Sequence, residues 1–143
     1  MAPVRNPPVS MRVFARQQTL ALLRRLADQV SRASKPGDPE AIHDLRVAIR
    51  RFSRSLRVFS QFLPGGKAGR VRRRLRDVMD LAAAVRDRDI ALELLQEARV
   101  PPRSPLAVSL RRERQAAERK LIAAAGRLER RDFSRKWRVW LRL

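Results

Sequence analysis

Hydrophobic residues recur along most of this chain at alternating steps of three and four, the spacing of one face of an α-helix. The clearest case is the stretch AIHDLRVAIRRFSRSLRVFSQFL, residues 41–63. Its apolar positions are Ile42, Leu45, Ile49, Phe52, Leu56, Phe59 and Leu63. No segment of any length alternates in the manner of a strand. The pattern predicts an all-α fold in which each helix packs one face into a shared core.

Capping residues and helix breakers divide the chain into successive helices. The first is expected from near Ser10 to Ala33. Its apolar stripe consists of Phe14, Leu20, Leu23, Ala27 and Val30. The second should begin with Asp38 as N-cap and Pro39 as its first residue, and should end at the breaker Pro64-Gly65-Gly66.

The rest of the chain predicts two further long helices and a short one. The third, residues 67–99, has the seam Val71, Leu75, Val78, Ala82 and Val85. Ser104 before Pro105 marks the start of the fourth. Its seam is Leu106, Leu110, Ala117, Leu121, Ala124 and Leu128. A short helix should follow Asp132. We expect an antiparallel four-helix bundle with a short C-terminal helical tail over residues 11–143, after a flexible proline-containing lead-in of residues 1–10.

The stretch of residues 41–63 also carries a basic stripe. On a wheel of about 3.6 residues per turn, its members fall in an arc of roughly 80°, about 130° from the centre of the apolar seam. They are His43, Arg46, Arg50, Arg54 and Arg57. No acidic residue interrupts the arc, and like charges at this spacing repel by a few tenths of a kcal/mol per pair. A polyanionic partner would relieve that repulsion, so the arc predicts one.

A weaker basic stripe is expected on the third helix. Its members are Arg72, Arg76 and Arg86, which flank the apolar seam. Met79 and the small Ala83, which separate them, could leave space for a ligand. Arg73 with Asp77, and Arg76 with Asp80, are spaced i,i+4, so part of this helix is expected to carry ordinary charge pairs.

Composition adds a large positive charge. The 143 residues include 34 Lys and Arg against 14 Asp and Glu, a formal net charge of +20, and only four of the 34 are lysine. Codon usage in a GC-rich genome would raise arginine everywhere. The functional interpretation is that a planar guanidinium group can donate two hydrogen bonds to the oxygens of one phosphate. The clustering of arginines on one arc favours this functional interpretation over codon usage. Charge alone leaves phosphate polymers, acidic proteins and anionic lipids open.

Missing residue types disfavour several classes of function. With no cysteine there is no disulfide, thiolate metal site or cysteine nucleophile. The only histidine, His43, is a poor metal ligand because the nearest carboxylates, Glu40 and Asp44, point elsewhere on the wheel. No metal or cofactor is therefore expected.

No stretch approaches the roughly 20 apolar residues of a spanning helix or resembles a secretory signal, so we expect a soluble cytoplasmic protein without a membrane partner.

Three pieces of the chain carry a resemblance to a known family. They are HDLRVAIRRF at residues 43–52 with RVFSQFL at 57–63, AAAVRDRDI at 82–90, and the aromatic end of the last helix. Together they resemble the CHAD family, the conserved histidine α-helical domain, in its N-terminal half. The resemblance implies an all-helical fold, a basic groove, and binding of inorganic polyphosphate without catalysis. Polyphosphate granules in the cytoplasm would then be the location.

The stripes and the resemblance together predict which residues contact polyphosphate. They are His43, Arg46, Arg50, Arg51, Arg54, Arg57, Arg72, Arg76 and Arg86. Because the resemblance covers half of the usual domain, we expect either a homodimer or a separate second half-domain. An apolar face on the short tail is the expected interface, since aromatic side chains on a short helix are hard to hide. That face consists of Phe133, Trp137, Trp140 and Leu141.

Other functions are weighed against polyphosphate binding. Non-specific nucleic-acid binding is the nearest competitor, because nucleic acid is also a phosphate polymer. However, the chain has no tyrosine, and its other aromatic residues lie mainly on predicted seams. A histidine phosphotransfer module is less favoured because His43 lies near a helix start. His43 could also be a structural residue bonded to a carboxylate or carbonyl.

An enzyme acting on phosphate would need carboxylates grouped around Mg²⁺. Asp87 and Asp89 are two residues apart and so lie on different faces of a helix. We interpret them as partners that orient arginines, as Asp44 would beside Arg51. No catalytic residue is therefore expected.

Overall fold

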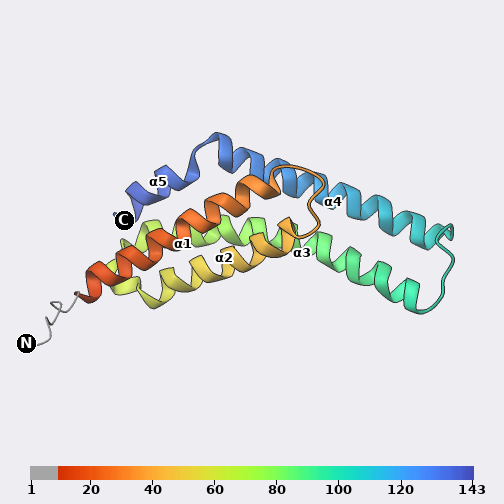
Figure 1. Ribbon diagram of the computed structural model, residues 1–143, viewed down its shortest axis with the longest axis horizontal. Coiled ribbons are helices and arrows are strands. Elements are labelled where there is room, and N and C mark those ends of the chain that lie inside the picture. Colours follow the sequence, from red (N-terminus) through yellow and green to blue (C-terminus); the bar gives the residue numbers. More distant parts are fainter. Residues whose placement is uncertain (1–9) are drawn as a thin grey trace, which may run out of the picture.

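The computed structural model describes residues 10–143, which form five α-helices and a short 3₁₀ turn (Figure 1). The elements are α1 (Met11–Ala33), α2 (Ala41–Val58), η1 (Ser60–Phe62), α3 (Gly65–Glu97), α4 (Pro105–Arg130) and α5 (Phe133–Trp140). These residues contain no strand, and the all-α prediction is confirmed. The predicted lead-in of residues 1–10 lies outside the described residues except for Ser10. The Ser10 hydroxyl caps α1 by accepting the Val13 N–H at 3.2 Å.

The four long helices form a closed ring of neighbours. α1 packs against α2, α2 against α3, α3 against α4, and α4 against α1. α3 and α4 make a hairpin whose far end extends beyond α1 and α2, as Figure 1 shows. After a bend at the end of α4, α5 slopes toward α1 and packs against α1, α3 and α4 (Figure 1). The result is the expected bundle with a helical tail.

The core contains most of the predicted seams. All five seam residues of α3 are buried, and so are Leu45, Ile49, Phe52 and Leu56 of α2. The prediction for α1 was wrong in part, because Phe14 is 43% exposed while Ala15, Thr19 and Leu26 are buried. The face of α1 that packs into the bundle is therefore rotated from the predicted stripe. Which of its apolar residues are buried depends on the neighbouring helices.

Leu106 marks the second departure in the core. It was placed in the α4 seam, but its side chain is 55% exposed, whereas Leu121 and Ala124 of the same seam are buried. The first turns of α4 lie in the part of the hairpin that extends past α1 and α2, so only α3 is there to cover them (Figure 1).

The boundaries around α2 also differ from the prediction. The regular α-helix begins at Ala41, two residues after Pro39, although the Asp38 carboxylate accepts the Glu40 N–H at 3.0 Å as a cap would. α2 ends at Val58, well before the predicted breaker. Phe59 leaves the helix and packs edge-on against Phe14, with ring centroids 6.1 Å apart.

The predicted breaker starts α3 instead of ending α2. Pro64 is the N-cap residue in an extended conformation, and its carbonyl accepts the Ala68 N–H at 2.9 Å. Gly65 and Gly66 lie in the first turn. Proline before a helix fits because it removes a donor that would have no partner in the helix.

The tail is part of the core. Phe133, Trp137 and Leu141 are at most 5% exposed, and the Trp137 ring lies parallel to Phe52 with centroids 6.3 Å apart. The expectation that these residues form an interface was therefore wrong. Asp132 adopts a left-handed conformation with φ 47°, and the chain bends there so that α5 packs onto the bundle. Of the predicted face only Trp140 is partly exposed.

Candidate functional site

A hollow of about 300 Å³ lies between α2 and α3. We call it the arginine hollow. Its lining residues are Ile49, Arg50, Ser53, Arg54 and Arg57 from α2, and Arg72, Arg76 and Met79 from α3. Five of these eight are arginine and none is acidic. Five of the nine residues predicted to bind polyphosphate are thus brought together here.

Helical geometry explains why these side chains converge. Ile49 and Phe52 of α2 are buried in the core. Because the basic arc lies on another side of the same helix, it points away from the core. On α3, the buried Val71 and Leu75 leave Arg72 and Arg76 beside the seam on the side that faces α2. Because α2 and α3 run antiparallel and pack less extensively than α1 with α2, a space remains between the two rows of arginines.

The arginines of the hollow have no carboxylate partner in the described part of the chain. The predicted i,i+4 pairs, Arg73 with Asp77 and Arg76 with Asp80, are not among the ion pairs there, so that prediction was wrong. Elsewhere, carboxylates do pair with arginines, for example Arg88 with Glu113 at 3.5 Å. The hollow therefore holds uncompensated positive charge.

Arg46 extends this charge along α2 toward Arg86 of α3. Its Nε atom is buried and has no hydrogen-bond partner in the structure of residues 10–143. Burial, followed by the like charges of Arg50 and Arg86, lowers the pKa of Arg46 from its ordinary value, while Asp87 opposes the shift. A guanidinium so placed would gain from an anion.

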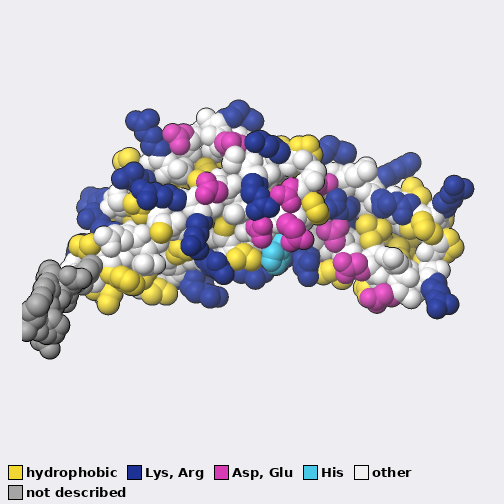
Figure 2. All heavy atoms as spheres, in the orientation of Figure 1, with side chains coloured by type: hydrophobic (Ala, Val, Ile, Leu, Met, Phe, Trp, Pro, Cys, Tyr) yellow, Lys and Arg dark blue, Asp and Glu magenta, His cyan; other side chains and the backbone are white. Residues whose placement is uncertain are grey.

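His43 lies in a different hollow, next to Arg86 but surrounded by acids. The carboxylate-bearing residues that line this hollow are Glu40, Asp89 and Glu93. Figure 2 shows the histidine among acidic side chains near the middle of the visible face, with Lys and Arg spread over the rest. Its surroundings thus attract a phosphate less strongly than the arginine hollow does.

Arg51 lies apart from the other predicted residues. It lines a hollow between α1 and α2 together with Arg25 and Asp44. Asp44 does not pair with Arg51 as predicted, because its carboxylate accepts from Arg32 of α1 at 2.8 Å. Arg51 is thus on the opposite side of α2 from the arginine hollow.

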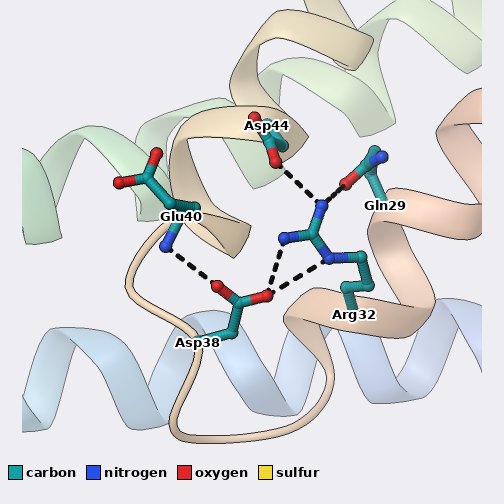
Figure 3. Close-up of polar contacts among 5 residues, drawn as sticks. All are labelled: Gln29, Arg32, Asp38, Glu40 and Asp44. Carbon is teal, nitrogen blue, oxygen red and sulfur yellow. Dashed lines mark hydrogen bonds and ion pairs between the residues drawn. The ribbon is translucent and has the colours of Figure 1, made fainter.

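Arg32 fixes the start of the helix that carries the basic arc. Figure 3 shows its guanidinium between Asp38 and Asp44, with Gln29 also accepting from it. The distances are 2.6 Å to the Asp38 carboxylate and 2.8 Å to that of Asp44. These contacts tie the end of α1 to the loop and to the first turn of α2. The hydrogen bond from Arg32 lowers the pKa of Asp38 from its ordinary value.

Asp89 is engaged in an ion pair, as the sequence suggested. Its carboxylate accepts from Arg114 of α4 at 2.5 Å, and Arg114 also donates to Glu118 at 2.8 Å.

No group of three or more histidine, aspartate or glutamate side chains within residues 10–143 is arranged to hold a metal ion. The same residues include no helix long and apolar enough to cross a bilayer.

Three lining residues of the hollow carried no prediction as ligand contacts, namely Ile49, Ser53 and Met79. Ser53 of α2 supplies a hydroxyl between the arginines, and Ile49 supplies an apolar floor. Ser53 follows Arg50 by three residues and precedes Arg57 by four, so its spacing along the helix could have indicated it. Met79 lines the hollow at the position where space for a ligand was expected.

Fold and site together define an all-α, strongly basic protein with an arginine-lined hollow between two antiparallel helices. The CHAD domain family matches residues 17–143, nearly the whole chain. The chain therefore belongs to the CHAD family, as its sequence indicated. No curated protein and no solved structure matches it.

Proposed function

We propose that this protein binds inorganic polyphosphate in the arginine hollow and does not act on it chemically. The observation that carries the proposal is the convergence of five arginines from α2 and α3 around one space without an acidic residue. One guanidinium group can donate two parallel hydrogen bonds to the oxygens of a phosphate. A row of such groups suits a polymer that carries a negative charge on every phosphate unit. Membership of the CHAD family supports the choice of polyphosphate.

Two of the α2 arginines that line the hollow provide the main test. Arg50→Ala with Arg54→Ala should weaken polyphosphate binding on the order of 100-fold, because each charge-assisted contact in so open a site contributes about 1.5 kcal/mol. Isothermal titration calorimetry with long-chain polyphosphate at physiological salt gives the comparison. Both side chains are exposed, so the fold should survive the change.

A matched control removes the same charge elsewhere. Arg112→Ala with Arg119→Ala takes two exposed arginines from α4, away from the hollow. This variant should lose only the small contribution of net charge. Equal losses of polyphosphate affinity in the two double variants would contradict binding in the hollow. They would show that only a diffuse electrostatic attraction holds the polymer.

Nucleic acid is the competing ligand, and competition distinguishes it. A net charge of +20 attracts any polyanion, so some binding of DNA is expected. Unlabelled polyphosphate should displace fluorescent single-stranded and duplex DNA at a lower phosphate concentration than DNA displaces labelled polyphosphate. The reverse order would favour a nucleic-acid-binding protein.

The absence of catalysis is a separate part of the proposal. Asp89 is bonded to Arg114, which leaves it poorly placed to hold a metal ion over a bound phosphate. The purified protein should therefore leave the length of polyphosphate unchanged on gels, with or without Mg²⁺ or Mn²⁺. Shortening that disappears in Asp89→Asn would contradict this part.

A further inference from the structure

A second cluster of positive charge surrounds Trp140 at the other side of the molecule. Lys67 Nζ lies 4.7 Å from the centre of the Trp140 ring, Arg70 Cζ 5.5 Å, and Lys136 Nζ 5.6 Å. These distances place any two of the three cations within about 11 Å of each other. All three side chains are exposed, and Trp140 is partly exposed. We call these four residues the tryptophan patch.

The tryptophan patch adjoins a hollow of about 360 Å³ at the end of α5. Its lining residues are Arg131, Asp132, Arg135, Lys136, Val139 and Trp140. Asp132 is the one acidic residue among them, against three cations. No ion pair in the described chain involves Lys67, Arg70 or Lys136. The aromatic ring attracts the three cations but cannot neutralise them, so positive charge accumulates here as it does in the arginine hollow.

The two basic sites lie on opposite sides of α3. At about 100° per residue, the direction midway between Lys67 and Arg70 is roughly 170° from that midway between Arg72 and Arg76. The structure agrees, since Arg72 and Arg76 face α2 while Lys67 and Arg70 contact Trp140 at the end of α5. One phosphate group therefore cannot reach both sites.

We propose that Lys67, Arg70, Lys136 and Trp140 form a second binding site for phosphate groups of a linear polymer, separate from the arginine hollow. The identity of the polymer rests on the proposed function. With sites on both sides of α3, one protein molecule holds two polymer segments at once. The cations, which lie over the ring, make the contacts with phosphate, and Trp140 holds them in place.

Trp140 also provides the measurement. The protein has two tryptophans, and Trp137 is only 1% exposed in the core, so a ligand at the patch should change the emission of Trp140 alone. Titration with inorganic tripolyphosphate should change the fluorescence, because the bound anion changes the electrostatic field at the ring that the three cations surround. Trp140→Phe should remove this response but keep an aromatic ring at the position. An unchanged emission at saturating tripolyphosphate would overturn the second site.

Paired variants separate the two sites. Lys67→Ala with Lys136→Ala should abolish the fluorescence response and reduce the calorimetric stoichiometry for tripolyphosphate from two sites to one. Arg50→Ala with Arg54→Ala should also reduce it to one, but should keep the fluorescence response. Circular dichroism confirms that each variant is folded. If either double variant abolished both signals, the sites would not be independent and the proposal would be wrong.

The outcomes also distinguish this inference from the proposed function. A fluorescence response without any effect of the hollow variant on binding would support the patch and contradict the hollow. Loss of binding in the hollow variant, together with no fluorescence response in the wild type, would support the hollow and contradict the patch. Single-stranded DNA should change Trp140 emission no more than polyphosphate of equal phosphate content. A larger, base-dependent quenching would show that the ring stacks on nucleobases and would overturn the assignment to phosphate.

Discussion

Arg46 illustrates at the scale of one residue how a partly buried positive charge opposes stability. Its buried Nε atom has no partner, and Arg50 and Arg86 add like charge to the cost of burial. A protein selected only for stability would place an apolar side chain of similar length here. A bound anion would give the Arg46 guanidinium a hydrogen-bond acceptor and would offset the nearby like charges.

We therefore expect Arg46→Met to stabilise the free protein and to weaken polyphosphate binding. Removing the partly buried charge should raise the melting temperature by roughly 3 °C, which corresponds to about 1 kcal/mol in a domain of this size. Thermal unfolding followed by circular dichroism, together with calorimetric titration, measures both effects. A lower melting temperature would show that the attraction of Asp87 outweighs burial and like-charge repulsion.

The same scale shows the limit of prediction from spacing. His43 and Arg51 belong to the same motif as Arg50, yet they lie in two other hollows. Arg51 follows Arg50 directly, and a step of one residue rotates the side chain by about 100° around the helix. His43 shares the arc of the arginines, but α3 brings Asp89 and Glu93 beside it. Only the packing of α3 on α2 determines that neighbourhood.

At the scale of the element, α5 completes the core instead of presenting an interface. Trp137→Ala should reduce the free energy of unfolding by about 3 to 5 kcal/mol, because it removes a buried ring that stacks on Phe52. Urea denaturation measures the loss. Val139→Ala is the control, since its side chain is 71% exposed and should cost little. A small effect of the tryptophan change would mean that α5 does not pack on the bundle in solution.

The link between α1 and α2 predicts a dependence on pH. Arg32 lowers the pKa of Asp38 from its ordinary value, so the carboxylate contributes stability above the ordinary aspartate pKa of about 3.9. That contribution is lost as the pH falls through the lowered value. The wild type should therefore be more stable than Asp38→Asn near neutral pH, and the difference should shrink below about pH 4. Melting curves from pH 7 to pH 3 provide the comparison. A difference that stays constant with pH would exclude the ionised carboxylate as its cause.

At the scale of the whole molecule, a net charge of +20 makes the free protein repel itself. A bound polyanion should stabilise it both through linkage and by reducing that repulsion. Polyphosphate at about 100 times its dissociation constant should raise the melting temperature by roughly 5 to 10 °C. The rise should shrink as salt is added, because counterions compete. Orthophosphate at equal phosphate concentration should have a much smaller effect, and an equal effect would argue against binding along a polymer.

The class of fold and the existence of a basic arc followed from the sequence alone. Both depend on local periodicity, because a helix of about 3.6 residues per turn places residues 46, 50, 54 and 57 on one side whatever surrounds it. Caps such as Ser104 before Pro105 also act locally, and α4 begins at Pro105 as predicted. The family likeness came from the same short stretches.

Tertiary structure decided which of these features meet. The arginine hollow exists because Arg72 and Arg76 face α2 across a loosely packed junction, and no local pattern gives the distance between two helices. Burial of Trp137 and exposure of Leu106 have the same origin, since each depends on which helix lies opposite. The cations around Trp140 come from α3 and α5, far apart in sequence. Periodicity determines the face of a helix, and packing determines what that face contacts.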